Sequence, residues 1–341
     1  MSLANNIAPT HSMRSDSVEV GFNKLRFTSF TSFGDEFINE HEAPAFIESV
    51  AWFQSLNAIA TPQHLKIVKN ATFERLVSRT FPFADLAGAR IATDLMILTF
   101  LIDDLSDVVE ATDDTAMHAM SAVEGQVTHV LRGGTPRPGE HPLAVAMRSI
   151  VDRAMLTYNP DWIDLMRKEF ITYLEMNRLE RINRLEGPGL SWTMFENTRY
   201  YSSCVLPFLY LSAGMGCTGC PSTVLSVPFV KIMTDLTVNH VAWVNDIVGA
   251  NKERKEAVNN NIVFVIANDR GLTMAGAVKD AVKRTNQECE VFLNLEHRLH
   301  AGGAVVDGDD LFNYIEVLKY WMRGSLDWHF ESKRYKVKAS K

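Results

Sequence analysis

The spacing of apolar residues is the feature that most limits what this chain can fold into. Over most of its length, apolar side chains recur every three or four residues, the pattern of a helix with one buried face. Alternating β-branched runs bounded by turn residues, which indicate strands, are scarce. Helices are expected over 43–57, 63–79, 87–105, 116–132, 142–156, 160–185, 191–212, 224–253, 257–269, 272–299 and 309–332. The sequence therefore predicts an all-α protein.

The connectors between these segments are short, and neither a repeat nor a change in composition marks a domain boundary. The chain has 341 residues, 46% of them hydrophobic, which is enough for a substantial buried core. We expect a flexible N-terminal tail over 1–17 and one α-helical bundle over 18–341, with its functional cavity between helices.

Charge and hydropathy exclude several classes of protein. The formal net charge is −7, and the basic residues cluster only at the extreme C-terminus, so no nucleic-acid partner is expected. No uninterrupted apolar run reaches the roughly 20 residues of a bilayer span. The N-terminus lacks the charged and apolar regions of a signal peptide. We expect a cytoplasmic protein without stable membrane insertion.

A glycine- and cysteine-rich stretch, AGMGCTGCPS, contains two misleading patterns. Cys217 and Cys220 form a C-x-x-C, but no second pair and no nearby histidines complete a zinc site. Gly214, Gly216 and Gly219 match the dinucleotide fingerprint, but no βαβ pattern surrounds them. We expect a turn between helices.

The first acidic cluster is in FLIDDLSDVVE. Asp103 and Asp107 lie four residues apart and share a helix face, with Asp104 turned about 100° beside them. The cluster follows the apolar run LMILTFLI, and three like charges at the end of a buried helix are costly without a compensating cation. Hard oxygen donors with no soft ligand nearby suit Mg²⁺. An acidic helix end in solvent is the alternative.

The second polar set is in WVNDIVGANKE, where Asn245, Gly249 and Glu253 lie on one side of a helix and span about 12 Å. Asn and Glu provide oxygen donors at the two ends of this line. Alone, the set is equally compatible with a solvated face. Two oxygen-ligand clusters on different helices, however, predict a cavity that clamps a diphosphate through several metal ions.

In this arrangement the chain resembles the class I terpene synthases of bacteria and fungi. DDLSD resembles the aspartate-rich motif of that family, and NDIVGANKE resembles its second metal motif. Arg199 lies 46 residues before Asn245, the spacing of the family's diphosphate-sensing arginine. Near the C-terminus, Arg334 and Tyr335 match a terminal Arg-Tyr pair. Phe81-Pro82 and NNNIV are supporting matches, so the resemblance extends from about residue 80 to 335.

The resemblance implies roles for the residues around the diphosphate. Arg199 and Arg334 would bind its oxygens, because a guanidinium fork matches that geometry and keeps its charge. A surface salt bridge is the alternative for each arginine. Lys252 would reach the same anion, and Tyr335 would donate a hydrogen bond to the leaving group.

The resemblance also implies roles along the pocket. Ser202 takes the place of a linker residue, usually acidic, and Ser203 that of a small effector residue whose carbonyl triggers ionisation. Phe100, Trp328 and His329 occupy positions of the aromatic pocket walls, where cation–π attraction holds a carbocation. Ordinary core packing is the alternative for the aromatic side chains.

Gly249 is the main departure from the family pattern, because a Ser or Thr hydroxyl usually binds metal at this position. Glycine has no side chain, so we expect a water molecule to take that coordination place.

The resemblance implies an all-α class I terpenoid synthase fold, three Mg²⁺ ions bound with diphosphate, and cyclisation of a prenyl diphosphate to a terpene. Farnesyl diphosphate is the default substrate, with a C20 or methylated prenyl diphosphate as alternatives. A homodimer is compatible with the resemblance. A chain-elongating prenyltransferase would need a second aspartate-rich motif, which NDIVGANKE is not. A non-catalytic helical binding protein with a degenerate site is the remaining alternative, and Gly249 is its best support.

Overall fold

The computed structural model describes residues 14–20, 23–29, 37–107, 113–183, 190–254, 260–302 and 308–332. These ranges are mainly helical, which confirms the predicted all-α fold. Their helices are α1 (Glu42–Ser55), α2 (Pro62–Ala71), α3 (Phe73–Thr80), α4 (Leu86–Asp107), α5 (Asp114–Leu131), α6 (Pro142–Thr157), α7 (Pro160–Asn183), α8 (Trp192–Ser202), α9 (Val205–Gly216), α10 (Pro221–Leu225), α11 (Pro228–Glu253), α12 (Ile262–Arg270), α13 (Met274–Gly302) and α14 (Gly308–Glu331).

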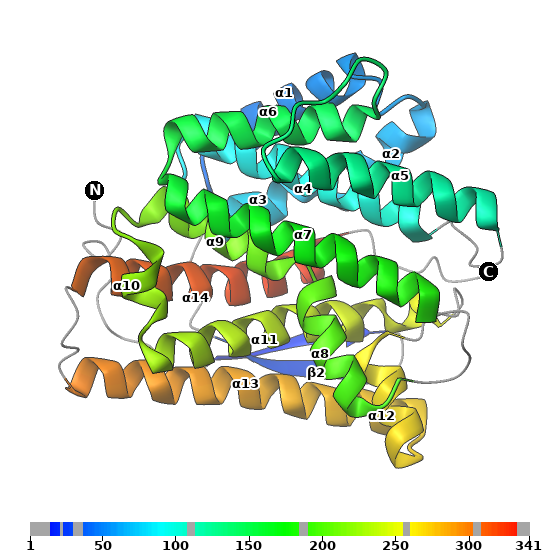
Figure 1. The fold of residues 1–341 in the computed structure, drawn as a ribbon. Helices are drawn as coiled ribbons and strands as arrows, with labels where there is room; N and C mark the ends of the chain where they lie inside the picture. The colour runs from blue at the N-terminus through cyan, green and yellow to red at the C-terminus, as the bar shows by residue number, and fades with distance from the viewer. Residues whose placement is uncertain are drawn as a thin grey trace.

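The long helices pack around α11 and α14 in the interior of the bundle (Figure 1). α11 contacts both α13 and α14, and α14 also contacts α3 and α9. α7 packs along α9, while α1, α4, α5 and α6 lie on the side of the bundle away from α13. The predicted acidic motifs are thus on two helices from different halves of the chain, α4 and α11. No described helix is both long and apolar enough to cross a membrane.

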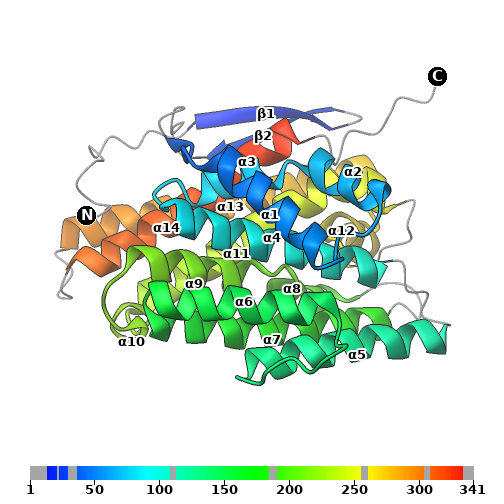
Figure 2. The same cartoon turned by 90° about the horizontal axis from the view of Figure 1, so that it is seen from above.

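A two-stranded hairpin corrects the expectation of helices alone. β1 (Arg14–Val20) pairs antiparallel with β2 (Asn23–Ser29), and Figure 2 shows the pair along the outside of the bundle. Phe27 of β2 is fully buried, and β2 contacts α13. Residues 14–17, expected in the flexible tail, therefore belong to a strand. The alternation of Leu25 and Phe27 was the signal for it.

The segment predicted as one helix over 191–212 is two helices. α8 ends at Ser202 and α9 begins at Val205, because Cys204 adopts a left-handed conformation with φ of 58°. Pro207 falls in the first turn of α9, where its missing N–H leaves no helical hydrogen bond unmade. This proline was the signal for a break that the apolar spacing concealed.

Three other predicted helices also have different limits. The segment 63–79 divides at Thr72, whose φ is 52°. The segment 224–253 divides before Pro228, the first residue of α11. For the predicted segment 257–269, the described helix α12 begins at Ile262, because Asn261 is extended and caps α12 with its side chain. Prolines and capping residues, more than periodicity, fix where these helices begin.

The glycine- and cysteine-rich stretch is a turn, as predicted. α9 ends at Gly216 and α10 begins at Pro221, so Cys217 and Cys220 lie in the connection between two helices. The four cysteines of the chain are unpaired. Neither a disulfide nor a dinucleotide-binding turn is formed here.

Candidate active site

One cavity brings the two predicted motifs together. Asp103 of α4 borders it, as do Asn245 and Glu253 of α11. The charged and amide residues that line it, which we call the polar wall, are Asp103, Glu180, Arg199, Asn245, Asp246, Glu253 and Asn260. The rings that line it, which we call the aromatic wall, are Phe100, Tyr173, Phe208, Trp321 and Trp328. A site for a polar group therefore adjoins a site for an apolar group.

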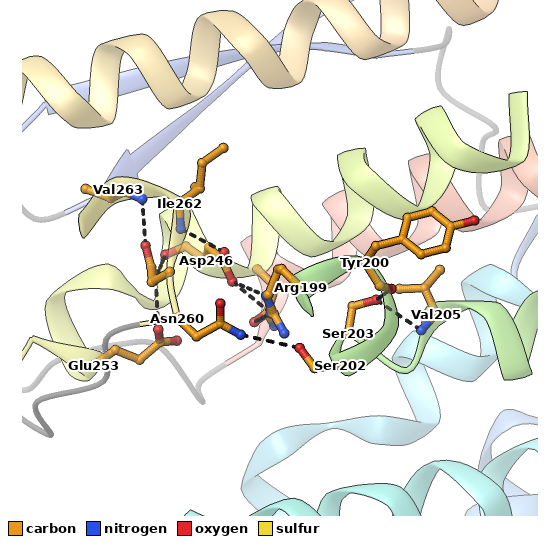
Figure 3. A network of polar contacts seen from close by, with 12 residues as sticks. Arg199, Tyr200, Ser202, Ser203, Val205, Asp246, Glu253, Asn260, Ile262 and Val263 are labelled. Carbon is orange, nitrogen blue, oxygen red and sulfur yellow. Dashed lines mark hydrogen bonds and ion pairs between the residues drawn. The ribbon is translucent and has the colours of Figure 1, made fainter. Parts of the chain in front are cut away.

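A buried ion pair anchors the polar wall. The Arg199 guanidinium lies 2.7 Å from a carboxylate oxygen of Asp246, and its Nε–H also donates to that oxygen at 2.9 Å. Only 15% of the Arg199 side chain and 1% of the Asp246 side chain are exposed to solvent. The alternative of a surface salt bridge is therefore wrong for Arg199. Figure 3 shows the guanidinium directed from α8 toward α11.

The surroundings of Arg199 are acidic. Burial alone would lower the pKa of its guanidinium, but the carboxylates of Asp246, Glu180 and Glu253 together raise it. Burial raises the pKa of Asp246, opposed by the guanidinium and by the Ile262 amide. A guanidinium does not lose its proton in proteins, so Arg199 keeps its positive charge at the cavity. Arg199 therefore lies among three carboxylates, which together favour a positive charge at this end of the cavity.

Asn261 connects the end of α11 to the start of α12. Its Nδ2 donates to the carbonyl of Asp246 at 2.7 Å and to Oε2 of Glu253 at 2.8 Å, while its Oδ1 accepts from the Val263 amide. The Ile262 amide donates to Asp246 at 3.0 Å (Figure 3). The Glu253 carboxylate is thus held by a buried side chain of the run NNNIV. In the sequence this run was only a supporting match, without a role.

Glu180 is a cavity residue that the sequence reasoning missed. Asn260 Nδ2 donates to its carboxylate and also lies 3.4 Å from the Ser202 hydroxyl. Glu180 follows Tyr173 by seven residues on α7, which places both on one helix face. In the sequence, the position of this acidic residue on the same helix face as Tyr173 could have indicated that it lines the cavity.

The rings of the aromatic wall are held by packing and by backbone contacts. Phe100 stacks on Phe73 with ring centroids 4.2 Å apart and lies 6.4 Å from Trp328. The Trp328 indole N–H donates to the carbonyls of Ala71 at 3.1 Å and Thr72 at 3.0 Å. The ring faces are therefore fixed by contacts that require no ligand.

The break between α8 and α9 also borders the cavity. Ser202 and Ser203 line it, together with Cys204. The Ser203 hydroxyl donates to the carbonyl of Tyr200 at 2.9 Å and accepts from the Val205 amide at 3.4 Å (Figure 3). The predicted linker and effector positions thus lie one turn from Arg199, where the helix ends. His329 lines the cavity from α14.

The remaining predicted site residues either do not line the cavity or lie outside the described part of the structure. Asp104 is half-buried on α4 and Gly249 is buried in α11, and neither is among the residues that line the cavity. Asp107 and Lys252 lie in helices, but their side chains are outside the described part of the structure. Arg334 and Tyr335 are likewise outside the described residues.

The donor atoms of the polar wall fit a hard cation. Asp103, Asn245 and Glu253 offer carboxylate and amide oxygens, the ligands of Mg²⁺. Within the described residues, no three His, Cys, Asp or Glu side chains form a group that could hold a metal ion by themselves. Donors from two helices are therefore expected to share ions with ligand oxygens and water, which Mg²⁺ tolerates.

Known proteins resemble this chain over most of its length. Residues 94–290, more than half of the chain, match the model of terpene synthase family 2, C-terminal metal binding. The chain is 25% identical over 290 residues to sesquiterpene synthase 6 of Postia placenta, covering 84% of this chain and 83% of the relative. It is 24% identical over 260 residues to (+)-T-muurolol synthase ((2E,6E)-farnesyl diphosphate cyclizing) of Roseiflexus castenholzii, covering 76% and 79%.

Solved structures agree on the fold. The crystal structure of linalool/nerolidol synthase from Streptomyces clavuligerus superposes with a TM-score of 0.74 at 21% identity. The match covers 86% of this chain and 96% of the other. At this identity the likeness concerns the fold alone.

Proposed function

The chain belongs to terpene synthase family 2, and we propose that it ionises farnesyl diphosphate with the help of Mg²⁺ and cyclises the carbocation to a terpene hydrocarbon or alcohol. The observation that carries this proposal is the meeting of the two motifs and Arg199 at one cavity that also has an aromatic wall. The reaction needs both surfaces, because one product of ionisation is an anion and the other is a carbocation.

The polar wall would bind the diphosphate end of the substrate. Asp103 on one helix, with Asn245 and Glu253 on another, would hold Mg²⁺ ions between the protein and the diphosphate, three ions by resemblance to the family. Bound Mg²⁺ supplies Lewis-acid stabilisation of the negative charge that develops on the leaving group. Asp104 and Asp107 are proposed to support the first motif.

Arg199 would bind diphosphate oxygens through its guanidinium fork. Its ion pair with Asp246 fixes the guanidinium at the cavity before any ligand arrives. A donor that is already oriented stabilises developing charge without reorganisation. Ser202 and Ser203 would couple this contact to ionisation, because both lie at the end of the helix that carries Arg199. Roles for Lys252, Arg334 and Tyr335 at the same anion rest on the sequence resemblance.

The aromatic wall would receive the carbocation. Phe100 and Trp328 present ring faces, and cation–π attraction is worth about 2 kcal/mol or more in a desolvated site. Burial of these rings also excludes water, which would quench the cation. Elimination of a proton would give a hydrocarbon, whereas capture of one water molecule would give an alcohol.

Farnesyl diphosphate is proposed because the Roseiflexus castenholzii relative is named for cyclising it, and another relative is named a sesquiterpene synthase. A C20 or methylated prenyl diphosphate is the alternative in the same reaction class. Gly249 offers no hydroxyl to a metal, so we propose that a water molecule occupies that coordination position. A crystal structure with Mg²⁺ and diphosphate that lacked a water beside Gly249 would refute this detail.

The test is incubation of the pure protein with Mg²⁺ and, separately, geranyl, farnesyl and geranylgeranyl diphosphate, with mass spectrometry of the extracted products. Cyclic C15 products from farnesyl diphosphate are expected. Products from geranylgeranyl diphosphate alone would assign the chain to C20 substrates. Longer prenyl diphosphates, formed when isopentenyl diphosphate is added, would indicate a prenyltransferase. Absence of turnover with every substrate would indicate a binding protein.

A further inference from the structure

His329 makes a contact within the polar wall that the proposed reaction does not use. It lies on α14, is 5% exposed, and its Nε2 is 3.3 Å from Nδ2 of Asn245 on α11. Asn245 is one of the proposed metal ligands. A histidine at this position can contact the substrate, or it can orient the side-chain amide of Asn245.

The hydrogen bonds of His329 determine which ring nitrogen carries the proton. Nδ1 lies 2.7 Å from the backbone carbonyl of Ser325, and a carbonyl oxygen only accepts. Nδ1 therefore carries the hydrogen and donates it. In the neutral ring, Nε2 is then an acceptor, and the Asn245 NH₂ group is the donor that it meets.

The contact at the oxygen end of the Asn245 amide indicates the same orientation. Its Oδ1 lies 3.4 Å from Nη2 of Arg199, which is a donor only. If the amide were turned by 180°, its oxygen would face the lone pair of His329 and its NH₂ group would face the guanidinium. Both contacts would become repulsive, so two neighbours on two different helices select one orientation.

This orientation is the one that metal binding requires. A divalent cation binds the amide oxygen, whereas the NH₂ group carries hydrogens and cannot be a ligand. The described hydrogen bond from Asn245 to His329 uses the NH₂ group, so it is compatible with an oxygen bound to metal. The His329 ring is itself fixed by an edge contact with Trp328, with centroids 4.7 Å apart, and by Ser325.

We propose that His329 is a positioning residue that holds the Asn245 amide with its oxygen toward the metal–diphosphate site. This inference rests on the proposed function, because it takes Asn245 as a metal ligand. Residues that orient metal ligands typically change metal affinity by about 10- to 100-fold when they are substituted. His329 would therefore act through metal affinity and not through contact with the carbocation.

The test measures Mg²⁺ binding without turnover, by titrating MgCl₂ into protein with saturating inorganic diphosphate and following heat and melting temperature. His329→Phe keeps a flat ring but has no acceptor, so its half-saturating Mg²⁺ concentration should rise by about 10- to 100-fold. His329→Gln offers an acceptor oxygen and should stay within about threefold of the unsubstituted protein. Equal affinity in His329→Phe and the unsubstituted protein would overturn the proposal.

A matched control is available on α11. His240 is buried, and its ring nitrogens have no hydrogen-bond partner in the described structure. Burial lowers the pKa of its imidazole to about 3, so its ring is uncharged near neutral pH. His240→Phe removes a neighbouring buried histidine without removing a described hydrogen bond to Asn245. Mg²⁺ affinity should remain within about threefold, and a loss as large as in His329→Phe would overturn the specific role of His329.

Asn245→Asp tests the orientation itself, because a carboxylate presents two equivalent oxygens and has no wrong orientation. In the Asn245→Asp background, adding His329→Phe should not weaken Mg²⁺ binding, because it removes only the contact between Nε2 and the second carboxylate oxygen. A loss of 10- to 100-fold in both backgrounds would overturn the orienting role. Absence of Mg²⁺-dependent diphosphate binding in the unsubstituted protein would instead refute the proposed metal site and the inference with it.

Discussion

The polar wall and the aromatic wall face the same cavity, but different forces hold their side chains. In the polar wall, Arg199, Asp246 and Glu253 are fixed by ion pairs and hydrogen bonds with residues of neighbouring elements. In the aromatic wall, Phe100 is fixed by stacking and Trp328 by two backbone carbonyls. The polar wall brings carboxylate and amide oxygens that suit a hard cation, whereas the aromatic wall brings apolar rings. We therefore expect substitutions in the first to stop ionisation and those in the second to redirect the products.

The largest effect is expected from loss of a proposed metal ligand. Asn245→Ala or Asp103→Ala should lower the rate of diphosphate release by roughly 10³-fold, the scale seen when an electrostatic contact to a transition state is removed. Both side chains line the cavity and are only partly buried, so circular dichroism and melting temperature should remain close to those of the unsubstituted protein. Near-normal activity of either variant would show that the metal assignment is wrong.

The second prediction distinguishes the contribution of Arg199 to folding stability from its contribution to activity. Arg199→Ala leaves Asp246 buried beside no cation, and removal of one partner of a buried pair costs about 3–5 kcal/mol. Urea denaturation should therefore show a clear loss in the free energy of unfolding, together with loss of activity.

Arg199→Lys is the matched control, because it keeps the positive charge but loses the bidentate fork. It should recover most of the stability and little of the activity. A stable Arg199→Ala protein would contradict the anchoring role of the ion pair.

The third prediction concerns the aromatic wall. Phe100→Leu keeps an apolar side chain but removes the ring face, and a loss of about 2 kcal/mol corresponds to roughly a 30-fold lower rate. Products of early quenching should increase in the mass-spectrometric profile. Phe100→Tyr should retain most of the rate. If the rate and the product profile of Phe100→Leu were unchanged, Phe100 would contribute only to packing and not to stabilisation of the carbocation.

The smallest effect lies outside both walls, at Glu288 of α13, which accepts a hydrogen bond from Asn239 of α11. Burial raises the pKa of this carboxyl to about 7, with Glu196 and Asp235 adding to the rise, against the hydrogen bond from Asn239. Its folded pKa is above the ordinary value of 4.5, so the unfolded chain binds fewer protons between these values. Stability from this group is therefore lost as pH rises from about 4.5 to about 7.

Glu288→Gln should remove this dependence. Its free energy of unfolding should exceed that of the unsubstituted protein by roughly 1–2 kcal/mol at pH 8, discounted for partial exposure, and by less at pH 5. Denaturation at the two pH values measures the difference. An equal effect at both would show that Glu288 has an ordinary pKa.

The sequence predicts some residues of the cavity and not others. Asp103, Asn245 and Arg199 were identified from motifs and spacing, because metal and anion binding restrict both residue type and separation along a helix. Asn261 and Glu180 were not, since their roles depend on partners on other helices. The same holds for His329, which the sequence placed beside the pocket but not beside Asn245.

Some features of the fold were likewise predicted from the sequence, and others were not. Apolar periodicity located the main helices, because it records which face each helix buries. It missed the breaks at Thr72 and Cys204, where two left-handed residues change direction without changing the apolar pattern. The hairpin was missed as well, because its apolar alternation is brief. The contour of the aromatic wall, which decides the product, depends on how separate helices pack and is not encoded in any local pattern.

The most direct test of the central claim is the release of diphosphate from farnesyl diphosphate as Mg²⁺ is varied, with products collected from the same reactions. We expect diphosphate release that saturates with Mg²⁺ and stops when the metal is chelated with EDTA. Cyclic C15 products should form in the same reactions. Asp103→Ala should abolish both. Release that persists in EDTA, or that is unaffected by Asp103→Ala, would contradict the account.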